Sequence, residues 1–585
     1  MKIPAPAISA NRVRRLLPVL IALVVLAAFW PTLRGDFVHW DDDANFLNNP
    51  HFRGLDWRNL RWMFTTLHMS NYQPLSWIVS ALGFSLWGMH PFGYHATSLA
   101  FHVLNAVLFY LVAVRLLRLA APAADAAALS IPAAFASLCF ALHPLRVEPV
   151  AWLSGQHDLL AGAFYLLAIL CYLRACSDEA RRRRWLWRCT ALFAAAMLCK
   201  VNGITLPFVL LLLDIYPLRR LSADPRQWWQ PQPRRVWLEK LPLLAVALAA
   251  GLLGLVARHQ TAVLPHSSLA FRIEQAGYGL AFYLGKTMVP VRLLPFYPIP
   301  LDLQLPLATV AASAALVVVL SALLVALRRA WPGALVAWTY YVVTLLPVLG
   351  LISFSTQLAA DRYTYLPGMA WALLGGGAVL AALSRLGSHG RRLLVTGLAA
   401  VLLLLAGLSW RQSRLWHDSE TLFRYTLSLN PNIPEVRNDL GFVLVNQRQT
   451  EAGMTEYRKA LALKPDFTRA MNNLGLALIG QGRYAEASTQ YRKALALEPD
   501  YAFGHNNLGL ALMYLGQTAE ALGHFQRAVD LVPEYVVAHN NLGGALLSLG
   551  RVDEAIAQFQ KALELRPDYS AAATMLRIAE AQRPR

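Results

Sequence analysis

The chain has 585 residues, of which 56% are hydrophobic and 15% are charged. About 45–50% apolar residues is usual for a soluble domain, so this composition excludes a wholly soluble chain. The formal net charge of +19 would suit a nucleic-acid-binding protein, but the arginines stand in short clusters between apolar runs. Such clusters are typical of membrane topology signals, and we expect no nucleic-acid partner.

Apolar runs recur between residues 16 and 410 and are absent from residues 411–585. Roughly 20 helical residues cross the hydrocarbon core of a bilayer. The pattern therefore predicts a polytopic membrane domain over residues 1–410, with eleven spans, and a soluble domain over residues 411–585. The candidate spans are 16–33, 93–115, 130–146, 157–175, 186–200, 203–218, 238–257, 307–327, 334–354, 366–384 and 392–410.

The first run follows Arg12, Arg14 and Arg15 and has no small-residue cleavage site after it. This pattern favours an uncleaved signal anchor with a cytoplasmic N-terminus. The inner segments then carry 23 Lys and Arg in 83 residues, and the outer loops 11 in about 140, as the positive-inside rule requires. Residues 276–294 are also apolar enough to cross, which would make the C-terminal domain cytoplasmic. Their prolines and cations favour a half-buried segment on the outer face, and we expect an external C-terminal domain.

The longest outer loop, residues 34–91, begins with Asp41, Asp42 and Asp43 between aromatic residues. The sequence from Asp56 to Phe64 predicts an amphipathic helix in the membrane interface, and a second such helix follows Asn71. The three carboxylates are therefore expected near the depth of the lipid headgroups. They form either a solvated acidic loop or a general base for a substrate that arrives in lipid.

Other ionisable residues stand at predicted outer ends of spans. His143, Arg146, Glu148, His157 and Asp158 crowd between two spans, where such groups are functional or mutually paired. The spacing of the histidines and Glu148 matches no compact metal motif, so we expect no metal and no cofactor.

Two cations, Lys200 and Arg362, also lie on the predicted outer side. Either could clamp a phosphate. The alternative is an ion pair, of Arg362 with Asp361 and of Lys200 with a nearby carboxylate.

The C-terminal domain repeats with a period of 34 residues, which is the tetratricopeptide pattern. Proline, glycine and alanine recur at fixed positions in each repeat. The period predicts an α-solenoid with full repeats at 431–464, 465–498, 499–532 and 533–566, a capping helix at 567–585, and a degenerate leading helix at 416–430.

Solenoids of this kind bind extended peptides on the concave face. One helical position is occupied by Asp439, Asn473, Asn507 and Asn541 in successive repeats. A carboxamide can both donate to and accept from a peptide unit, so these side chains are candidate acceptor-peptide contacts. The alternative is hydrogen bonding within the solenoid.

Three elements precede the repeats: Phe37-Val38-His39-Trp40-Asp41-Asp42, the His-Pro-Leu-Arg-Val-Glu-Pro-Val-Ala-Trp sequence at 143–152, and Asp-Arg-Tyr-Thr-Tyr-Leu-Pro at 361–367. Together they resemble the transmembrane and tetratricopeptide-repeat O-mannosyltransferase family, and more closely its bacterial relatives. The resemblance implies an all-α GT-C glycosyltransferase whose catalytic carboxylate is Asp41 or Asp42, with Asp43 extending the pair. Many bacterial members have a histidine where this chain has Arg146. Many also have Glu-Arg-Lys-Asp where this chain has residues 155–158.

The donor implied by the resemblance is a sugar, with mannose as the candidate, on a polyprenyl or dolichyl monophosphate. The implied acceptor is a Ser or Thr hydroxyl of a protein outside the cytosol. The carboxylate would remove the hydroxyl proton, and Arg362 or Lys200, with His143 and Arg146 near them, would bind the lipid phosphate. One displacement inverts the anomeric centre, whereas a retaining reaction would need Glu148 as a second carboxylate.

We expect the protein in a bacterial inner membrane, with the repeats in the periplasm. Two other interpretations stay open, a non-enzymatic membrane-anchored scaffold for envelope proteins and an enzyme with a glycan or lipid acceptor.

Overall fold

The computed structural model describes residues 10–222, 224–228, 230–259, 268–300, 304–351 and 357–583. The chain divides into two compact units, the first ending at Leu422 and the second beginning at Phe423. The predicted all-α fold is confirmed, since the described residues contain only one short sheet, in which β1 (Tyr297–Pro298) pairs antiparallel with β2 (Gln357–Ala359). Most of the predicted inner segment 1–15 lies outside the described residues.

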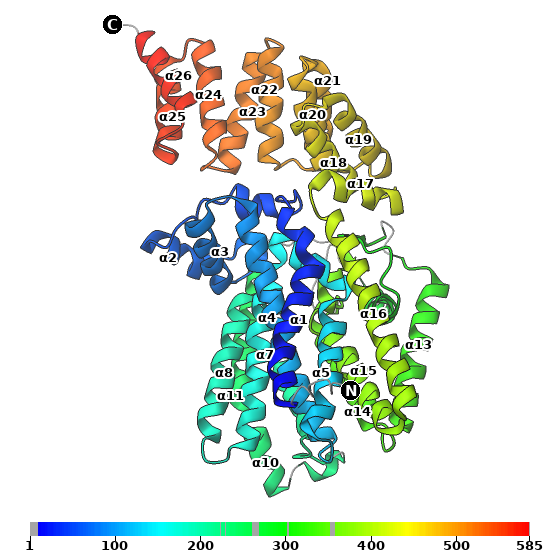
Figure 1. The fold of residues 1–585 in the computed structure, drawn as a ribbon. Coiled ribbons are helices and arrows are strands. Elements are labelled where there is room, and N and C mark those ends of the chain that lie inside the picture. The colour runs from blue at the N-terminus through cyan, green and yellow to red at the C-terminus, as the bar shows by residue number, and fades with distance from the viewer. Residues whose placement is uncertain are drawn as a thin grey trace, which may run out of the picture. The chain divides into compact units, whose positions relative to one another are not determined.

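The first unit is a bundle of helices (Figure 1). Its helices are α1 (Ala10–Phe29), α2 (Trp57–Thr65), α3 (Pro74–Trp87), α4 (Pro91–Ala120), α5 (Ala126–Ala141), α6 (Val147–Ala151), α7 (Gln156–Ser177), α8 (Arg182–Cys199), α9 (Leu206–Ile215), α10 (Pro231–Leu238), α11 (Leu241–His259), α12 (Leu269–Met288), α13 (Leu307–Ala326), α14 (Pro332–Leu345), α15 (Gly368–Arg385) and α16 (Ser388–Leu415).

Seven helical segments among the described residues are long and apolar enough to cross a membrane. An eighth arises if α5 and the segment Pro144–Ala151, which meet at 59°, form one broken span. The protein is therefore a multi-pass membrane protein, but the predicted count of eleven spans is not confirmed. The difference has a physical basis, because α9 and α14 are shorter than a bilayer crossing requires and α8 begins with a run of arginines.

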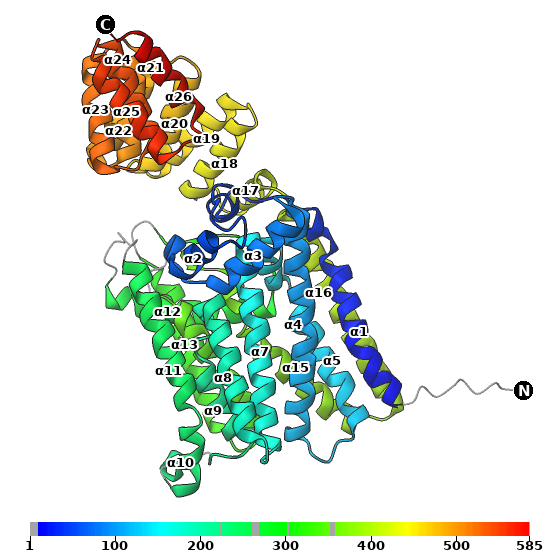
Figure 2. The same ribbon diagram turned by 90° about the vertical axis from the view of Figure 1, so that its left-hand side faces the viewer.

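Helices α2 and α3 lie at one end of this bundle, and α10 lies at the opposite end (Figure 2). The two helices predicted in loop 34–91 are confirmed. The carboxylate of Asp56 caps α2 by accepting a hydrogen bond from the Asn59 backbone N–H at 2.9 Å. In α2, Met63 is fully buried whereas Trp57 is 77% exposed, as expected for an amphipathic helix at an interface.

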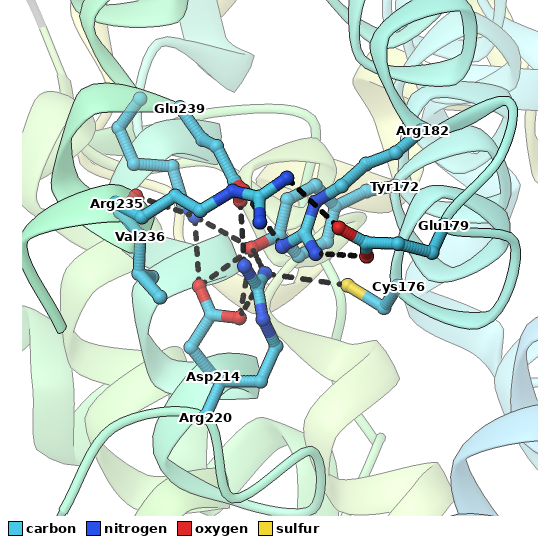
Figure 3. A network of polar contacts seen from close by, with 10 residues as sticks. Tyr172, Cys176, Glu179, Arg182, Asp214, Arg220, Arg235, Val236 and Glu239 are labelled. Carbon is cyan, nitrogen blue, oxygen red and sulfur yellow. Dashed lines mark hydrogen bonds and ion pairs between the residues drawn. The ribbon is translucent and has the colours of Figure 1, made fainter. Parts of the chain in front are cut away.

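At the end that holds α10, charged side chains form a closed network (Figure 3). Asp214 is fully buried, and its carboxylate pairs with Lys240 at 2.7 Å and Arg220 at 3.0 Å. The Tyr172 hydroxyl donates to the same carboxylate at 2.6 Å. Glu239 extends the network by pairing with Arg220 and Arg182, each at 2.7 Å. These contacts tie α7, α8 and α9 to Arg220, in the segment after α9, and to the two residues between α10 and α11.

The second unit consists of paired helices. After α17 (Ser419–Leu429), which begins in the first unit, the helices are α18 (Pro434–Asn446), α19 (Thr450–Leu463), α20 (Thr468–Gly480), α21 (Tyr484–Leu497), α22 (Ala502–Tyr514), α23 (Thr518–Leu531), α24 (Val536–Ser548), α25 (Val552–Leu565) and α26 (Ser570–Ala581). The first helix of each pair starts 34 residues after the previous one, and α26 continues the series. The predicted tetratricopeptide solenoid is confirmed.

Within each pair, a glycine of the first helix faces an aromatic ring of the second. A Cβ atom on Gly475 would lie 2.6 Å from the Tyr491 ring, and one on Gly509 would lie 2.7 Å from Phe525. Both rings are buried in the core of the solenoid. The recurring glycine is therefore required by close packing of the ring against the helix backbone.

We predict that Gly475→Ala destabilises the solenoid by about 1–3 kcal/mol, the usual cost of overpacking a core. Hydrogen exchange of the purified full-length protein, followed over residues 468–497, measures the loss of protection. Gly480→Ala is the matched control, because nothing lies within 4 Å of a Cβ there and alanine favours a helix. Equal protection in the two variants would contradict this packing argument.

The second prediction concerns the buried carboxylate of Asp214. Asp214→Ala leaves the fully buried Lys240 without its 2.7 Å partner, while Arg220 keeps Glu239, and losing one partner of a buried pair costs about 3–5 kcal/mol. The midpoint temperature of unfolding in detergent should fall, whereas Glu554→Ala, at an exposed pair with Arg551, should leave it nearly unchanged. Adding Lys240→Met to Asp214→Ala should recover part of the loss. If Lys240→Met lowers the midpoint temperature of unfolding further, the unpaired charge of Lys240 is not the cause of the lost stability.

Candidate functional site

The candidate site lies at the end of the bundle that holds α2 and α3. Segments from distant parts of the first unit meet there. They are the acidic loop 36–47, the buried segment 140–163, the loop around β1, the loop around β2 and residues 416–419.

Asp42 is fully buried, and hydrogen bonds from two segments reach its carboxylate. One oxygen accepts from the Ser154 hydroxyl at 2.6 Å and the Ser154 backbone N–H at 2.9 Å, and the other accepts from the Val38 N–H at 3.0 Å. Burial raises the pKa of Asp42 to about 7, although these hydrogen bonds act in the opposite direction. The carboxylate thus fixes the acidic loop to Ser154 and titrates near neutral pH.

The rest of the acidic loop is held by further contacts. The Asn45 amide donates to the Ser154 hydroxyl at 2.9 Å, the His39 N–H donates to the Ser419 hydroxyl at 2.9 Å, and the Asp36 N–H donates to the His417 carbonyl at 2.8 Å. Asp41 and Asp43 are only partly buried. The loop is therefore anchored on both sides, and Asp41 and Asp43 are its partly exposed carboxylates.

Glu148 and Arg362 form a buried ion pair. The Arg362 guanidinium donates to one oxygen of Glu148, and the Arg362 backbone N–H donates to the other at 2.7 Å. The guanidinium also lies over the Trp152 ring, 4.9 Å from its centroid. Burial alone would lower the pKa of Arg362, but the nearby carboxylates of Glu148 and Asp158 raise it. Arg362 therefore stays protonated.

The expected alternative for Arg362 was an ion pair with Asp361, and the structure provides a different partner. Asp361 instead accepts a hydrogen bond from the Tyr297 hydroxyl at 2.9 Å. The alternative for Lys200, a nearby carboxylate, is found, since its ammonium group lies 2.7 Å from Asp158. The Asn202 amide donates to the other oxygen of Asp158 at 3.1 Å. Neither contact tests whether these cations bind a phosphate.

Two other sequence candidates for the donor phosphate are used inside the protein. Arg146 is 1% exposed, donates to the Thr364 hydroxyl at 3.1 Å, and lies over the Phe140 ring. His143 accepts from the Leu145 N–H at 3.3 Å, and its other ring nitrogen lies 3.0 Å from the Thr287 carbonyl. Both side chains therefore brace the segment that carries Glu148.

His157 is buried beside Gln73, with 3.3 Å between its Nε2 atom and the amide nitrogen of Gln73. Within the described part of the chain, no group of three or more His, Cys, Asp or Glu side chains is arranged to hold a metal ion.

Sequence reasoning missed two residues that shape this site. Ser154 lies within the polar segment 143–158, but its hydroxyl gave no pattern that points to Asp42, 112 residues earlier. Tyr297 stands in β1, in a stretch without a sequence motif, and its hydroxyl reaches Asp361 just after β2, the strand with which β1 pairs. Only the aromatic and polar composition of these stretches could have pointed to either.

In the second unit, the asparagine ladder is hydrogen-bonded from repeat to repeat. The amide of Asn473 donates to Asn438 at 3.0 Å, that of Asn507 to Asn472 at 2.8 Å, and that of Asn541 to Asn506 at 2.9 Å. In the first repeat, Asp439 accepts from Asn438 at 2.9 Å and lies 3.3 Å from Arg469. Hydrogen bonding within the solenoid is thus present, and peptide binding by these residues stays a prediction.

Known proteins resemble the chain in both parts. A tetratricopeptide-repeat family model matches residues 506–570, and a TPR repeat model matches residues 476–515. Among solved structures, the crystal structure of YrrB, "a TPR protein with an unusual peptide-binding site", is 26% identical and covers 27% of this chain and 82% of its own, with a TM-score of 0.25.

Three curated relatives match this chain at 25–30% identity. Protein O-mannosyl-transferase TMTC1 of Homo sapiens is 26% identical over 479 residues, which is 73% of this chain and 52% of that protein. Protein O-mannosyl-transferase Tmtc3 of Drosophila melanogaster is 25% identical over 442 residues, 66% of this chain and 47% of that protein. Protein O-mannosyl-transferase TMTC4 of Homo sapiens is 30% identical over 230 residues, 35% of this chain and 30% of that protein.

The chain spans about half the length of the first two of these relatives. Further matches, at 28–30% identity, are to the TMTC2 proteins of Mus musculus and Homo sapiens. The chain is a distant relative of the protein O-mannosyl-transferases TMTC1, TMTC2, TMTC3 and TMTC4.

Proposed function

We propose that the protein is a membrane glycosyltransferase that transfers a sugar from a polyprenyl-phosphate donor to Ser or Thr hydroxyls of proteins. The observation that carries the proposal is the hydrogen bond between Asp42 and Ser154, which fixes the loop with the partly buried Asp41 to the buried segment that also carries Glu148, the partner of Arg362. The names of the relatives favour a protein hydroxyl as acceptor and mannose as the sugar.

In the proposed reaction, Asp41 is the general base and Asp42 is a positioning residue. Both oxygens of Asp42 already accept hydrogen bonds from Val38 and Ser154, so Asp42 has little capacity left for a substrate. Asp41 accepts the proton of the acceptor hydroxyl while its oxygen forms a bond to the anomeric carbon. The bond from that carbon to the phosphate oxygen breaks, and the bonding electrons leave with the polyprenyl phosphate.

This single displacement inverts the anomeric centre. A retaining reaction would require Glu148 as a nucleophile, but both of its oxygens accept from Arg362. The departing phosphate needs a cation nearby. Lys200 is the better candidate, because an ammonium group has three donors and one of them serves Asp158, whereas Arg362 is held by Glu148 and Trp152.

The proposed orientation places this site on the outer face of a bacterial inner membrane and the solenoid in the periplasm. It is supported by the distribution of Lys and Arg in the sequence and by the arginine-rich network around Asp214 at the opposite end of the first unit. In this orientation, a protein emerging into the periplasm could meet both units.

We predict that Asp41→Asn lowers kcat about 10²–10⁴-fold, the usual contribution of a general base. Asp43→Asn, one residue further along, is the matched control and should retain transfer within tenfold. Transfer from a mannosyl polyprenyl phosphate to an envelope protein, measured by intact mass, is the assay. Full activity of Asp41→Asn would rule out this residue as the base.

The pH dependence tests the positioning role of Asp42 in the same assay. Because burial raises the pKa of Asp42 to about 7, its carboxylate becomes protonated as the pH falls through 7 and loses acceptor capacity for Ser154 and Val38. Transfer should therefore decline below pH 7. Asp42→Asn, which cannot ionise, should be less active at pH 8 and should lack this inflection. An unchanged profile in Asp42→Asn would contradict the role.

The last prediction concerns the acceptor. If the amides of Asn473 and Asn507 each donate to an acceptor backbone, replacing both by alanine removes about 1 kcal/mol per hydrogen bond. The KM for a protein acceptor should then rise about tenfold or more, while the KM for a short Ser/Thr peptide should change little. Gln526→Ala, on the exposed face of α23, is the control. Equal effects on both acceptors would mean that these amides only stabilise the solenoid, which hydrogen exchange would report.

A further inference from the structure

Three arginines from three helices lie close together at the end of the first unit that holds α10. Arg115 lies near the end of α4, Arg174 near the end of α7, and Arg188 in the second turn of α8. Helix α7 packs against both α4 and α8 (Figure 2). The Arg115 guanidinium interacts electrostatically with Arg174, and the Cys171 thiol interacts with Arg115 and Arg188. The three positive charges therefore lie around one position on α7.

This arginine cluster has no negative partner among the residues that the structure describes. The acid beside it, Asp178, accepts hydrogen bonds from the Arg181 backbone N–H at 3.2 Å and from the Trp185 indole at 3.4 Å. One terminal nitrogen of Arg115, Nη1, is buried and has no hydrogen-bond partner in the described part of the chain. Like charges repel each other, so the cluster is an electrostatic site for an anion.

The indole ring of Trp185 holds two of these arginines in position. The Arg188 guanidinium lies 4.6 Å from the ring centroid and that of Arg174 lies 5.9 Å from it, within the range of cation–π attraction. Trp187, two residues further along α8, is 56% exposed. Tryptophans are typical of the boundary between the hydrocarbon core and the headgroups of a bilayer. The arginine cluster is therefore expected at the depth of the lipid headgroups.

The arginine cluster is separate from the closed network at the same end of the unit (Figure 3). Tyr172 of α7 and Arg182 of α8 belong to that network and have carboxylate partners there. Arg174 and Arg188, on the same two helices, are exposed. A topology signal requires only charges in the loops that flank a span, whereas Arg115 stands five residues before the end of α4. The cluster thus has a feature that topology does not require.

An apolar strip on α4 leads from the bilayer core to the arginine cluster. Leu104 is 41% exposed and Leu111 is 37% exposed. Residues 104, 111 and 115 are seven and four positions apart and so share one face of the helix. This face extends about 16 Å at 1.5 Å per residue, enough to contact much of an acyl chain. Guanidinium groups bind phosphate oxygens through paired hydrogen bonds, and basic pockets between membrane helices bind lipid headgroups.

We propose that the cluster of Arg115, Arg174 and Arg188 binds the phosphate of an anionic phospholipid, with an acyl chain along Leu104 and Leu111. The apolar strip is the reason for choosing a lipid over a soluble anion. The bound headgroup neutralises the repulsion among the arginines and links α4, α7 and α8. This site lies at the opposite end of the unit from the acidic loop, and it does not rest on the proposed function.

Native mass spectrometry of the full-length protein, released from micelles that contain equal amounts of phosphatidylglycerol and phosphatidylcholine, tests the site. The wild type should retain phosphatidylglycerol preferentially, and Arg115→Gln combined with Arg188→Gln should lower this preference at least tenfold. Arg183→Gln combined with Arg329→Gln is the matched control, because it removes two exposed charges outside the cluster on the predicted inner side. Equal losses in the two double variants would indicate general attraction to a positive surface and would overturn the proposal.

The tryptophan provides a second test that leaves every charge in place. Trp185→Leu removes the ring beside Arg174 and Arg188 and should weaken the preference several-fold, whereas Trp187→Leu should leave it unchanged. The same preference in Trp185→Leu as in the wild type would contradict a built site. An excess of inorganic phosphate should displace little phosphatidylglycerol, because it lacks the acyl chains. Ready displacement would assign the cluster to a soluble anion and overturn the assignment to a lipid.

Discussion

The complete burial of residues 140–163 is the constraint on which the candidate site depends. This segment carries Arg146, Glu148 and Asp158, and each of its residues is buried. A buried charge without a partner is costly, so each must find one outside the segment. Glu148 pairs with Arg362, and Asp158 pairs with Lys200. Because these partners come from distant parts of the chain, pairing the two carboxylates brings the segment after α8 and the segment after β2 to the same end of the bundle.

The charged side chains at the two ends of the first unit have different surroundings. Around Asp214, carboxylates alternate with Lys240, Arg220 and other cations, and the fully buried Lys240–Asp214 pair is closed to substrates. At the opposite end, Asp41 is partly buried and Lys200 borders a cavity. Paired charges that stay closed stabilise a bundle, whereas charges that border open space can meet a ligand. This difference is the physical reason for placing the chemistry at the end that holds α2 and α3.

The sequence was most informative where one physical requirement recurs. The 34-residue period predicted the solenoid because each repeat needs a glycine under an aromatic ring, as at Gly475 and Tyr491. The amphipathic helix α2 was predictable from its own residues. Pairing over long distances was not predictable: the ion pair considered as the alternative for Arg362 was with Asp361, whereas Arg362 pairs with Glu148, 214 residues away. The predicted eleven spans also exceed the seven or eight segments of the described residues that are long and apolar enough to cross a membrane. Several of the predicted spans form helices shorter than a bilayer crossing requires.

In the proposed reaction Asp41 and Asp42 have different roles, which the sequence of the acidic loop does not reveal. Adjacent carboxylates repel each other, and Asp41 adds to the burial that raises the pKa of Asp42. The Ser154 hydroxyl and two backbone N–H groups make that burial tolerable by occupying both oxygens of Asp42. A carboxylate held by these hydrogen bonds is fixed in position, and its oxygens have little capacity left for a substrate. In the proposed reaction the neighbouring Asp41 gains a fixed position from these bonds and is itself only partly buried, and a general base needs a fixed position within reach of the proton that it removes.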